Sequence, residues 1–139
     1  AQSALADAAP SMTEPFLRSA LQEDRLLVAE QGETLCGFAL LDQCGTDGWL
    51  QEFDVRFAFG GQGIGRALLA FSCAWARGRG CRRLTLTTFR NVPFNAPFYT
   101  RFGFAELVAD ETLPAHLRNA LAQEEAAGLR DRCAMALDL

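Results

Sequence analysis

The feature that most constrains how this chain can fold is a cluster of glycines directly in front of an apolar helical pattern. Gly60, Gly61, Gly63 and Gly65 lie within six positions. Glycine in a helix interior costs roughly 0.5–1 kcal/mol relative to alanine, so such a cluster needs an explanation. A tight turn needs one or two glycines, whereas an anion held by free N–H groups at a helix N-terminus needs more bare backbone. The cluster therefore predicts a strand–turn–helix unit, with a plain turn and an anion site as the alternatives.

Short apolar runs alternate with helical patterns along the rest of the chain. Strands are expected at residues 25–31, 34–43, 49–57, 81–89, 104–108 and 133–139, and helices within 1–24, over 63–77, just before Gly103 and over 113–127. This order predicts a mixed α/β domain with an antiparallel start and one β–α–β crossover around the glycine cluster. No repeat or linker interrupts it, so residues 1–139 are expected to form a single domain.

Two apolar stripes are expected to face the core. Ile64, Leu68, Phe71 and Trp75 repeat at spacings of four, three and four, which is typical of one helix face. In residues 133–139 an apolar side chain occupies every second position, which predicts a strand with one apolar face.

The composition restricts the classes of partner and cofactor. A net charge of −4 disfavours a nucleic-acid surface, which is normally basic. Five scattered cysteines without a CxxC pair predict core thiols in a reducing cytoplasm rather than disulfides or a zinc site. The single histidine, His116, is expected on a solvated helix face, and no metal site is predicted. No apolar run approaches the ~18–20 residues of a membrane span.

Two familiar phosphate-binding loops fail a residue-by-residue test. Gly60 and Gly65 have the spacing of a Walker A loop, but Arg66 and Ala67 stand where it needs lysine and a magnesium-binding hydroxyl. The GxGxxG dinucleotide fingerprint fails in both registers, because Arg66 and Leu68 occupy its last glycine position. The sequence therefore does not support a nucleotide-binding domain.

The loop and the helix behind it instead resemble those of N-acetyltransferases of the GNAT superfamily. The acetyl-CoA signature of that family is Gln/Arg-x-x-Gly-x-Gly/Ala. Gly63 and Gly65 match its two glycines, and Gln62 and Ile64 lie in its core. The chain departs from the signature at Gly60, which stands at the Gln/Arg position.

A second match to this family lies downstream. Tyr99, Gly103 and Phe104 fit its Tyr-x-x-x-Gly-Phe segment, while its asparagine, seven residues before the tyrosine, falls on Val92 with Asn95 nearby. The resemblance implies a GNAT-like, mostly antiparallel mixed sheet flanked by helices, with a central β–α–β unit around the CoA-binding loop. Family members usually begin with a further strand and helix, so the first strand of the fold is expected to be absent from this chain.

The resemblance also implies that acetyl-CoA is the co-substrate, and it indicates where the pyrophosphate, the pantetheine and the thioester bind. Main-chain N–H groups of the loop hold the pyrophosphate at the positive end of the helix dipole. Pantetheine pairs with the strand at 49–56 like an added strand, and the Val55 N–H polarises the thioester carbonyl. The candidate cofactor-binding residues are Val55, Gly61, Gln62, Gly63, Ile64, Gly65, Arg66 and Asn95.

Catalysis of this kind needs a proton acceptor for the amine and a proton donor for the CoA thiolate. Side chains two residues apart in a strand lie on the same face, so Glu52 and Asp54 are expected to share one face of the strand at 49–57. Glu52 is the candidate base, and Asp54 is the candidate contact for the positive charge of the amine. An exposed strand end is the alternative for both acids. The resemblance makes Tyr99 the proton donor, and a packed core aromatic is the alternative.

The predicted function is transfer of an acetyl group from acetyl-CoA to a primary amine of a small molecule or peptide, by direct attack on the thioester. A non-catalytic acyl-CoA-binding or sensor domain is the alternative, supported by Gly60. Neither nucleic acid nor a membrane is expected as a partner, and a homodimer through the last strand is an option in this family. Acceptor pockets are built from variable loops, so the sequence does not specify the amine.

Overall fold

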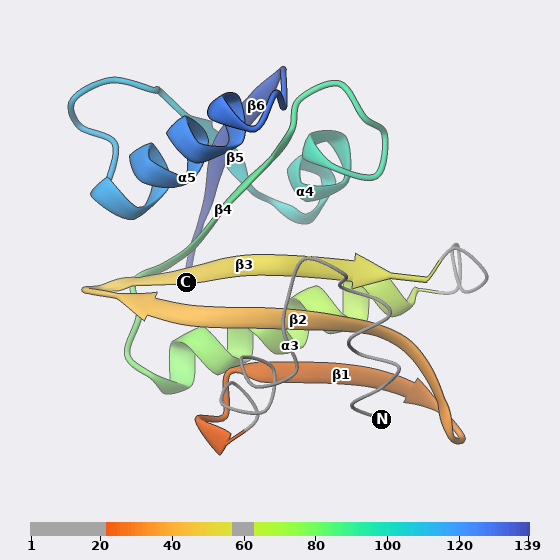
Figure 1. The fold of residues 1–139 in the computed structure, drawn as a ribbon. Helices are drawn as coiled ribbons and strands as arrows, with labels where there is room; N and C mark the ends of the chain where they lie inside the picture. The colour runs from red at the N-terminus through yellow and green to blue at the C-terminus, as the bar shows by residue number, and fades with distance from the viewer. Residues whose placement is uncertain (1–21, 57–62) are drawn as a thin grey trace. The chain divides into compact units, whose positions relative to one another are not determined.

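The computed structural model describes residues 22–56 and 63–139 (Figure 1). Its strands are β1 (Leu26–Gln31), β2 (Thr34–Cys44), β3 (Asp47–Val55), β4 (Arg83–Phe89), β5 (Ala105–Leu107) and β6 (Arg132–Asp138). Its helices are α3 (Ile64–Gly78), α4 (Ala96–Phe102) and α5 (Ala115–Ala126). Every strand expected from the sequence is present, as are the three helices expected after the glycine cluster. The helix expected within residues 1–24 lies almost wholly outside the described residues.

The six strands form a mixed sheet in the order β1-β2-β3-β4-β6-β5. The pairs β1–β2, β4–β6 and β5–β6 are antiparallel, whereas β3 and β4 are parallel. Helix α3 connects the two parallel strands, because a parallel pair cannot be joined by a tight turn. The mostly antiparallel mixed sheet with one β–α–β crossover is therefore confirmed.

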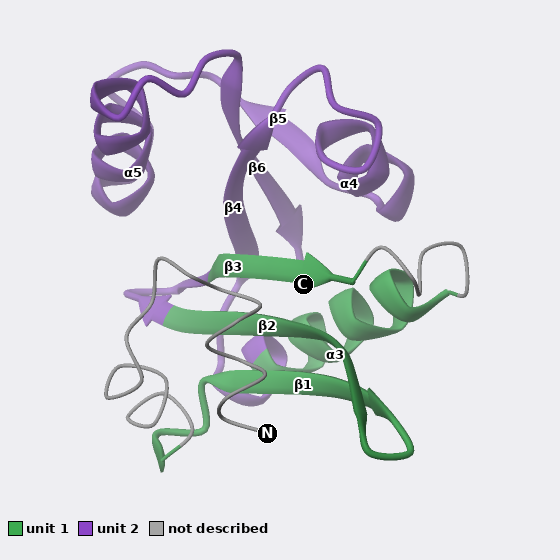
Figure 2. Cartoon of the chain, turned by 45° about the vertical axis from the view of Figure 1, so that its right-hand side comes forward, with its two compact units in different colours: residues 1–42, 50–75 green, residues 43–49, 76–139 purple. Residues whose placement is uncertain are grey.

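The chain divides into two compact units, which Figure 2 shows in different colours. Unit 1 consists of residues 1–42 and 50–75, and unit 2 consists of residues 43–49 and 76–139. Three elements, β2, β3 and α3, contribute residues to both units. That residues 1–139 behave as a single domain stays a prediction.

In unit 1, β2 and α3 supply much of the core. Seven successive residues of β2 are buried, as is usual for an inner strand. Leu69, Ser72 and Cys73 form the buried face of α3. Of the stripe expected from the sequence, Leu68 is buried but Phe71 is 68% exposed, so that prediction is wrong. The buried face of α3 includes small residues. The apolar pattern in the sequence instead follows the larger side chains, one position away along the helix.

In unit 2, α5 packs against the inner strand β6. Leu113, Leu117 and Ala134 form a buried cluster, with Trp49, Leu107 and Leu121 packed against it. The three successive residues Cys133–Met135 are buried, since β6 lies between β4 and β5. The predicted strand is present with Cys133 and Met135 buried, and Ala134 on its other face is buried as well, because a strand covered on both faces buries neighbouring side chains alike.

The cysteines are all free thiols, and four of the five are buried. Burial is the main cause that raises the pKa of Cys81, and it raises the pKa of Cys133 to about 11. Such thiols stay protonated near neutral pH, which agrees with their expected role as core residues. Within the described part of the chain, no three His, Cys, Asp or Glu side chains are grouped to hold a metal, and no helix is long and apolar enough to cross a membrane.

Candidate functional site

The turn into α3 exposes backbone where the sequence predicts it. Gly63 has φ +76°, a left-handed value that favours glycine, and a Cβ there would meet no atom within 4 Å. Its carbonyl accepts the N–H of Ala67 at 3.0 Å, so the helix begins at Ile64. The first N–H groups of an α-helix have no partner inside the helix, and no acid lies in this first turn. This end of α3 therefore has the chemistry to bind an anion.

Glu52 and Asp54 lie on one exposed face of β3, as the two-residue period predicts. Burial of the Asp54 carboxyl raises its pKa, while the charge of Arg56 and a hydrogen bond from the Val55 N–H act in the opposite direction. The Val55 N–H therefore faces this carboxyl. The effect of partial burial on the Asp54 pKa is larger than the opposing effects of Arg56 and the Val55 N–H. Asp54 is therefore a weaker acid than a free aspartate, which suits a group that accepts a proton.

The end of β3 is held close to β2 at Gly37. A Cβ on Gly37 would collide with the carbonyl oxygen of Asp54 and would lie 3.1 Å from the Cα of Val55. Just beyond, the Arg56 N–H donates to the carbonyl of Cys36 at 2.7 Å. Glycine at this position therefore lets the main chain that carries the candidate acids lie directly against its neighbour.

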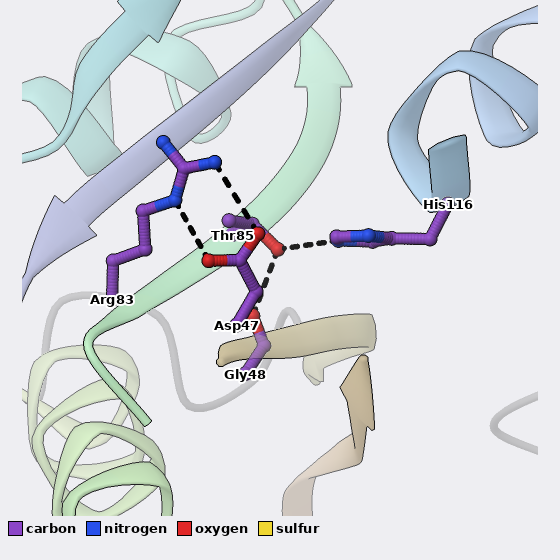
Figure 3. Close-up of polar contacts among 5 residues, drawn as sticks. All are labelled: Asp47, Gly48, Arg83, Thr85 and His116. Carbon is purple, nitrogen blue, oxygen red and sulfur yellow. Dashed lines mark hydrogen bonds and ion pairs between the residues drawn. The ribbon is translucent and has the colours of Figure 1, made fainter. Parts of the chain in front are cut away.

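The parallel pairing of β3 with β4 covers only three residues on each strand, all within unit 2. Asp47, Gly48 and Trp49 lie opposite Arg83, Leu84 and Thr85. The register ends there, although β3 continues to Val55 and β4 to Phe89. At the first pair, Arg83 Nε and Nη2 donate to the two carboxylate oxygens of Asp47 at 2.8 and 3.3 Å (Figure 3).

At the last pair, the buried Thr85 hydroxyl joins three elements. Thr85 Oγ1 donates its single proton to the Gly48 carbonyl at 2.8 Å, and it lies 2.9 Å from His116 Nε2 (Figure 3). Since that proton is already used, Nε2 must carry the hydrogen and donate it to Thr85. The His116 ring also packs against Trp49, with centroids 5.2 Å apart. The expected solvated position of His116 is therefore wrong, because this side chain attaches the start of α5 to β4.

Tyr99 lies on α4 in unit 2 and is 7% exposed. Its ring meets Phe98 and Phe104 edge to face, with centroids 5.3 and 5.5 Å apart. Burial strongly raises the pKa of the Tyr99 hydroxyl, and the nearby charge of Arg132 acts against this. The hydroxyl is therefore protonated at neutral pH, as a proton donor must be. Asn95 precedes the helix, and its Oδ1 accepts the Thr88 hydroxyl at 2.8 Å, which joins α4 to β4.

The structure places the described candidates in two groups. Unit 1 contains Glu52, Asp54, Val55, Gly63, Ile64, Gly65 and Arg66; unit 2 contains Asn95 and Tyr99. Gly61 and Gln62 lie outside the described residues. Sequence reasoning missed the polar partners on β4, where Thr85, Thr87 and Thr88 each hydrogen-bond to another element. Three threonines in one buried strand were the available signal, because buried hydroxyls need partners.

Comparison with protein families gives a match over most of the chain. The model of the Acetyltransferase (GNAT) family matches residues 4–104, well over half of the sequence.

Solved structures share the fold. Rv2747 from Mycobacterium tuberculosis, crystallised with CoA, is 20% identical, with a TM-score of 0.77 over 99% of this chain and 93% of that one. N-acetylglutamate synthase from Neisseria gonorrhoeae, complexed with coenzyme A and N-acetyl-glutamate, is 22% identical, with a TM-score of 0.74. The match covers 92% of this chain but only 28% of that longer enzyme. The ribosomal-protein-S18-alanine N-acetyltransferase from Escherichia coli is 24% identical, with a TM-score of 0.64 over 91% and 77% of the two chains.

Proposed function

The chain belongs to the acetyltransferase (GNAT) family, and on that premise we propose that it transfers the acetyl group of acetyl-CoA to a primary amine of a small molecule or peptide. The observation that carries the proposal is the turn at Gly63, where the family's acetyl-CoA signature coincides with a left-handed backbone and an open helix N-terminus. The structures of Rv2747 and of the Neisseria synthase, both determined with CoA, support the same co-substrate.

The CoA pyrophosphate is proposed to bind at the start of α3. The residues that would hold it are Gly61, Gln62, Gly63, Ile64, Gly65 and Arg66, with Asn95 as a further contact. The described part of this turn fits the group, because it offers helix N–H donors, no acid in the first turn and no side chain at Gly63. No metal ion is part of the proposed site.

The reacting end of acetyl-CoA is proposed to lie along β3. Pantetheine would pair with the strand's backbone, and the Val55 N–H would polarise the thioester carbonyl. This N–H acts to lower the pKa of the Asp54 carboxyl, so the thioester oxygen would replace that carboxyl beside the N–H as negative charge develops there.

The transfer itself needs no covalent enzyme intermediate. The neutral amine nitrogen attacks the thioester carbon, an N–C bond forms and the C–S bond breaks. Glu52 is proposed to take a proton from the amine, directly or through water, with Asp54 beside it on the same strand face. Tyr99 donates its hydroxyl proton to the departing thiolate, which leaves as CoA.

The experiment that tests the donor site is the shift in melting temperature with acetyl-CoA, beside CoA, ATP and NAD. A ligand at 100 times its dissociation constant adds about 2.7 kcal/mol to stability. We expect shifts with acetyl-CoA and CoA only. Release of CoA thiol would then be measured with L-glutamate, a peptide with N-terminal alanine, a polyamine and an aminoglycoside as acceptors. No shift with acetyl-CoA on folded protein would overturn the proposal.

A second function, binding of acyl-CoA without transfer, is favoured by one observation. Gly60 stands where the family signature has Gln or Arg, a side chain that would help to hold the pyrophosphate. A thermal shift with acetyl-CoA without CoA release from any amine would select this alternative.

The location and the assembly are part of the same proposal. Five free thiols suit a reducing compartment, so we place the protein in the cytoplasm. The last strand is β6, and β5 already pairs with its residues Ala134–Ala136. A homodimer that forms through β6 would therefore have to pair at the end of this strand. Sedimentation at several concentrations would measure the assembly.

A further inference from the structure

Unit 2 contains a cavity that none of the proposed catalytic residues lines. It has a volume of about 640 Å³ and lies against the end of α5 and the chain that leads into β6. Leu121, Leu129 and Ala109 supply apolar walls, while charge comes from Glu125, Arg130, Asp131 and Arg132. This size and mixture are typical of small-molecule pockets, which combine apolar surface with a few polar groups.

The Arg132 side chain in this cavity is held in one orientation. Its Nε donates to Glu124 Oε1 at 2.8 Å, and its Nη2 lies 3.4 Å from Thr87 Oγ1. Thr87 in turn donates to the other Glu124 oxygen at 2.8 Å, and the guanidinium stacks over the Phe89 ring at 4.4 Å. A guanidinium fixed in this way loses little entropy when it binds a carboxylate.

Three further charges line the cavity outside the ion pair of Arg132 with Glu124. Among the described residues, neither the Arg130 guanidinium nor the Glu125 carboxylate has a hydrogen-bonding or ion-pair partner, and both are exposed. The exposed Asp131 carboxylate adds a second anion to the cavity wall, and its charge also acts on Arg90. Arg132 is already neutralised by Glu124, so a ligand that complements the other charges carries one carboxylate for Arg130, one ammonium group for the acids and an apolar remainder.

We propose that this cavity binds an α-amino acid with an apolar side chain. The carboxylate pairs with Arg130 beside the fixed Arg132, the ammonium group with Glu125, and the side chain lies against Leu121 and Leu129.

Isothermal titration of the protein alone with L-leucine tests the binding site. We expect saturable binding that weakens at least about tenfold in Arg130→Gln and in Glu125→Gln, since each removes one charge-assisted contact. The matched control is Arg118→Gln, which changes an exposed arginine on α5 outside the cavity that has no partner among the described residues, and this variant should bind as wild type does. 4-Methylpentanoate lacks the ammonium group and 3-methylbutylamine lacks the carboxylate, so both should bind at least about tenfold more weakly.

The outcomes separate this inference from the proposed function. Absence of L-leucine binding, or binding unchanged in both cavity variants, would overturn the inference even if acetyl-CoA raises the melting temperature. L-Leucine binding that both cavity variants weaken would support the inference, whether or not acetyl-CoA binds or CoA is released.

Discussion

Tyr99 is buried among aromatic rings and yet carries a hydroxyl, where a phenylalanine would pack equally well. Its raised pKa keeps the proton in place across neutral and alkaline pH, which is the state that a donor to CoA thiolate requires. Tyr99→Phe keeps the ring contacts and removes the proton. We expect turnover to fall about 100-fold, while the thermal shift with acetyl-CoA stays as in wild type. Turnover equal to that of wild type would leave Tyr99 a core aromatic.

Protonation of the single residue Asp54 makes the free energy of unfolding depend on pH. Its pKa is raised by burial, so the folded state prefers the protonated carboxyl. Stability contributed by this group is therefore lost as the pH rises from the unfolded pKa to the folded pKa, and it stays lost above it. We expect Asp54→Asn to be at least as stable as wild type at pH 7, with no gain at pH 3, in urea unfolding. A clear loss of stability at pH 7 would contradict this.

The same variant and Glu52→Gln separate the roles of the two acids. If Glu52 is the base, Glu52→Gln should lower kcat/KM for the amine about 100-fold and remove the acid limb of its pH profile. Asp54→Asn should instead raise KM for the amine and keep the acid limb. The reverse pattern would assign the base to Asp54.

At the scale of elements, side-chain hydrogen bonds accompany both ends of the short β3–β4 ladder. Asp47 and Arg83 join the first pair, and Thr85 joins the last pair to Gly48 and His116. Thr85→Val has nearly the same shape but can neither donate to Gly48 nor accept from His116. Because it leaves buried polar groups unpaired, we expect a loss of about 1–3 kcal/mol in the free energy of unfolding.

Thr85→Ser is the matched control, since it keeps the hydroxyl and should recover most of this free energy. His116→Gln keeps an N–H donor and should destabilise less than His116→Leu. Equal stability of the valine and serine variants in urea unfolding would show that Thr85 acts by packing alone.

At the scale of the whole molecule, two units share three continuous elements. Strands β2 and β3 and helix α3 run from one unit into the other, so neither unit can unfold completely without breaking strands and a helix that the other also contains. We therefore expect one cooperative transition, in which the calorimetric and van't Hoff enthalpies agree. Two resolved transitions would show that the single domain predicted for residues 1–139 is wrong.

The sequence by itself determined the order and kind of the elements and the family. Short apolar runs separated by turns, and a glycine cluster before a helix, depend on local periodicity and backbone freedom, which neighbouring residues specify. The same local period placed Glu52 and Asp54 on one exposed face of β3.

Only the tertiary structure decided which side chains meet. Phe71 is exposed and Ser72 buried because the face of α3 is set by the unit 1 core, not by the size of its side chains. His116 bonds to Thr85, and Arg132 is fixed by Glu124 and Thr87, across 31, 8 and 45 residues of chain. Contacts at such separations depend on how the strands are paired and covered, which local patterns do not encode. The cavity at Arg130 and Glu125 exists for the same reason, since it forms only where α5 and β6 come together.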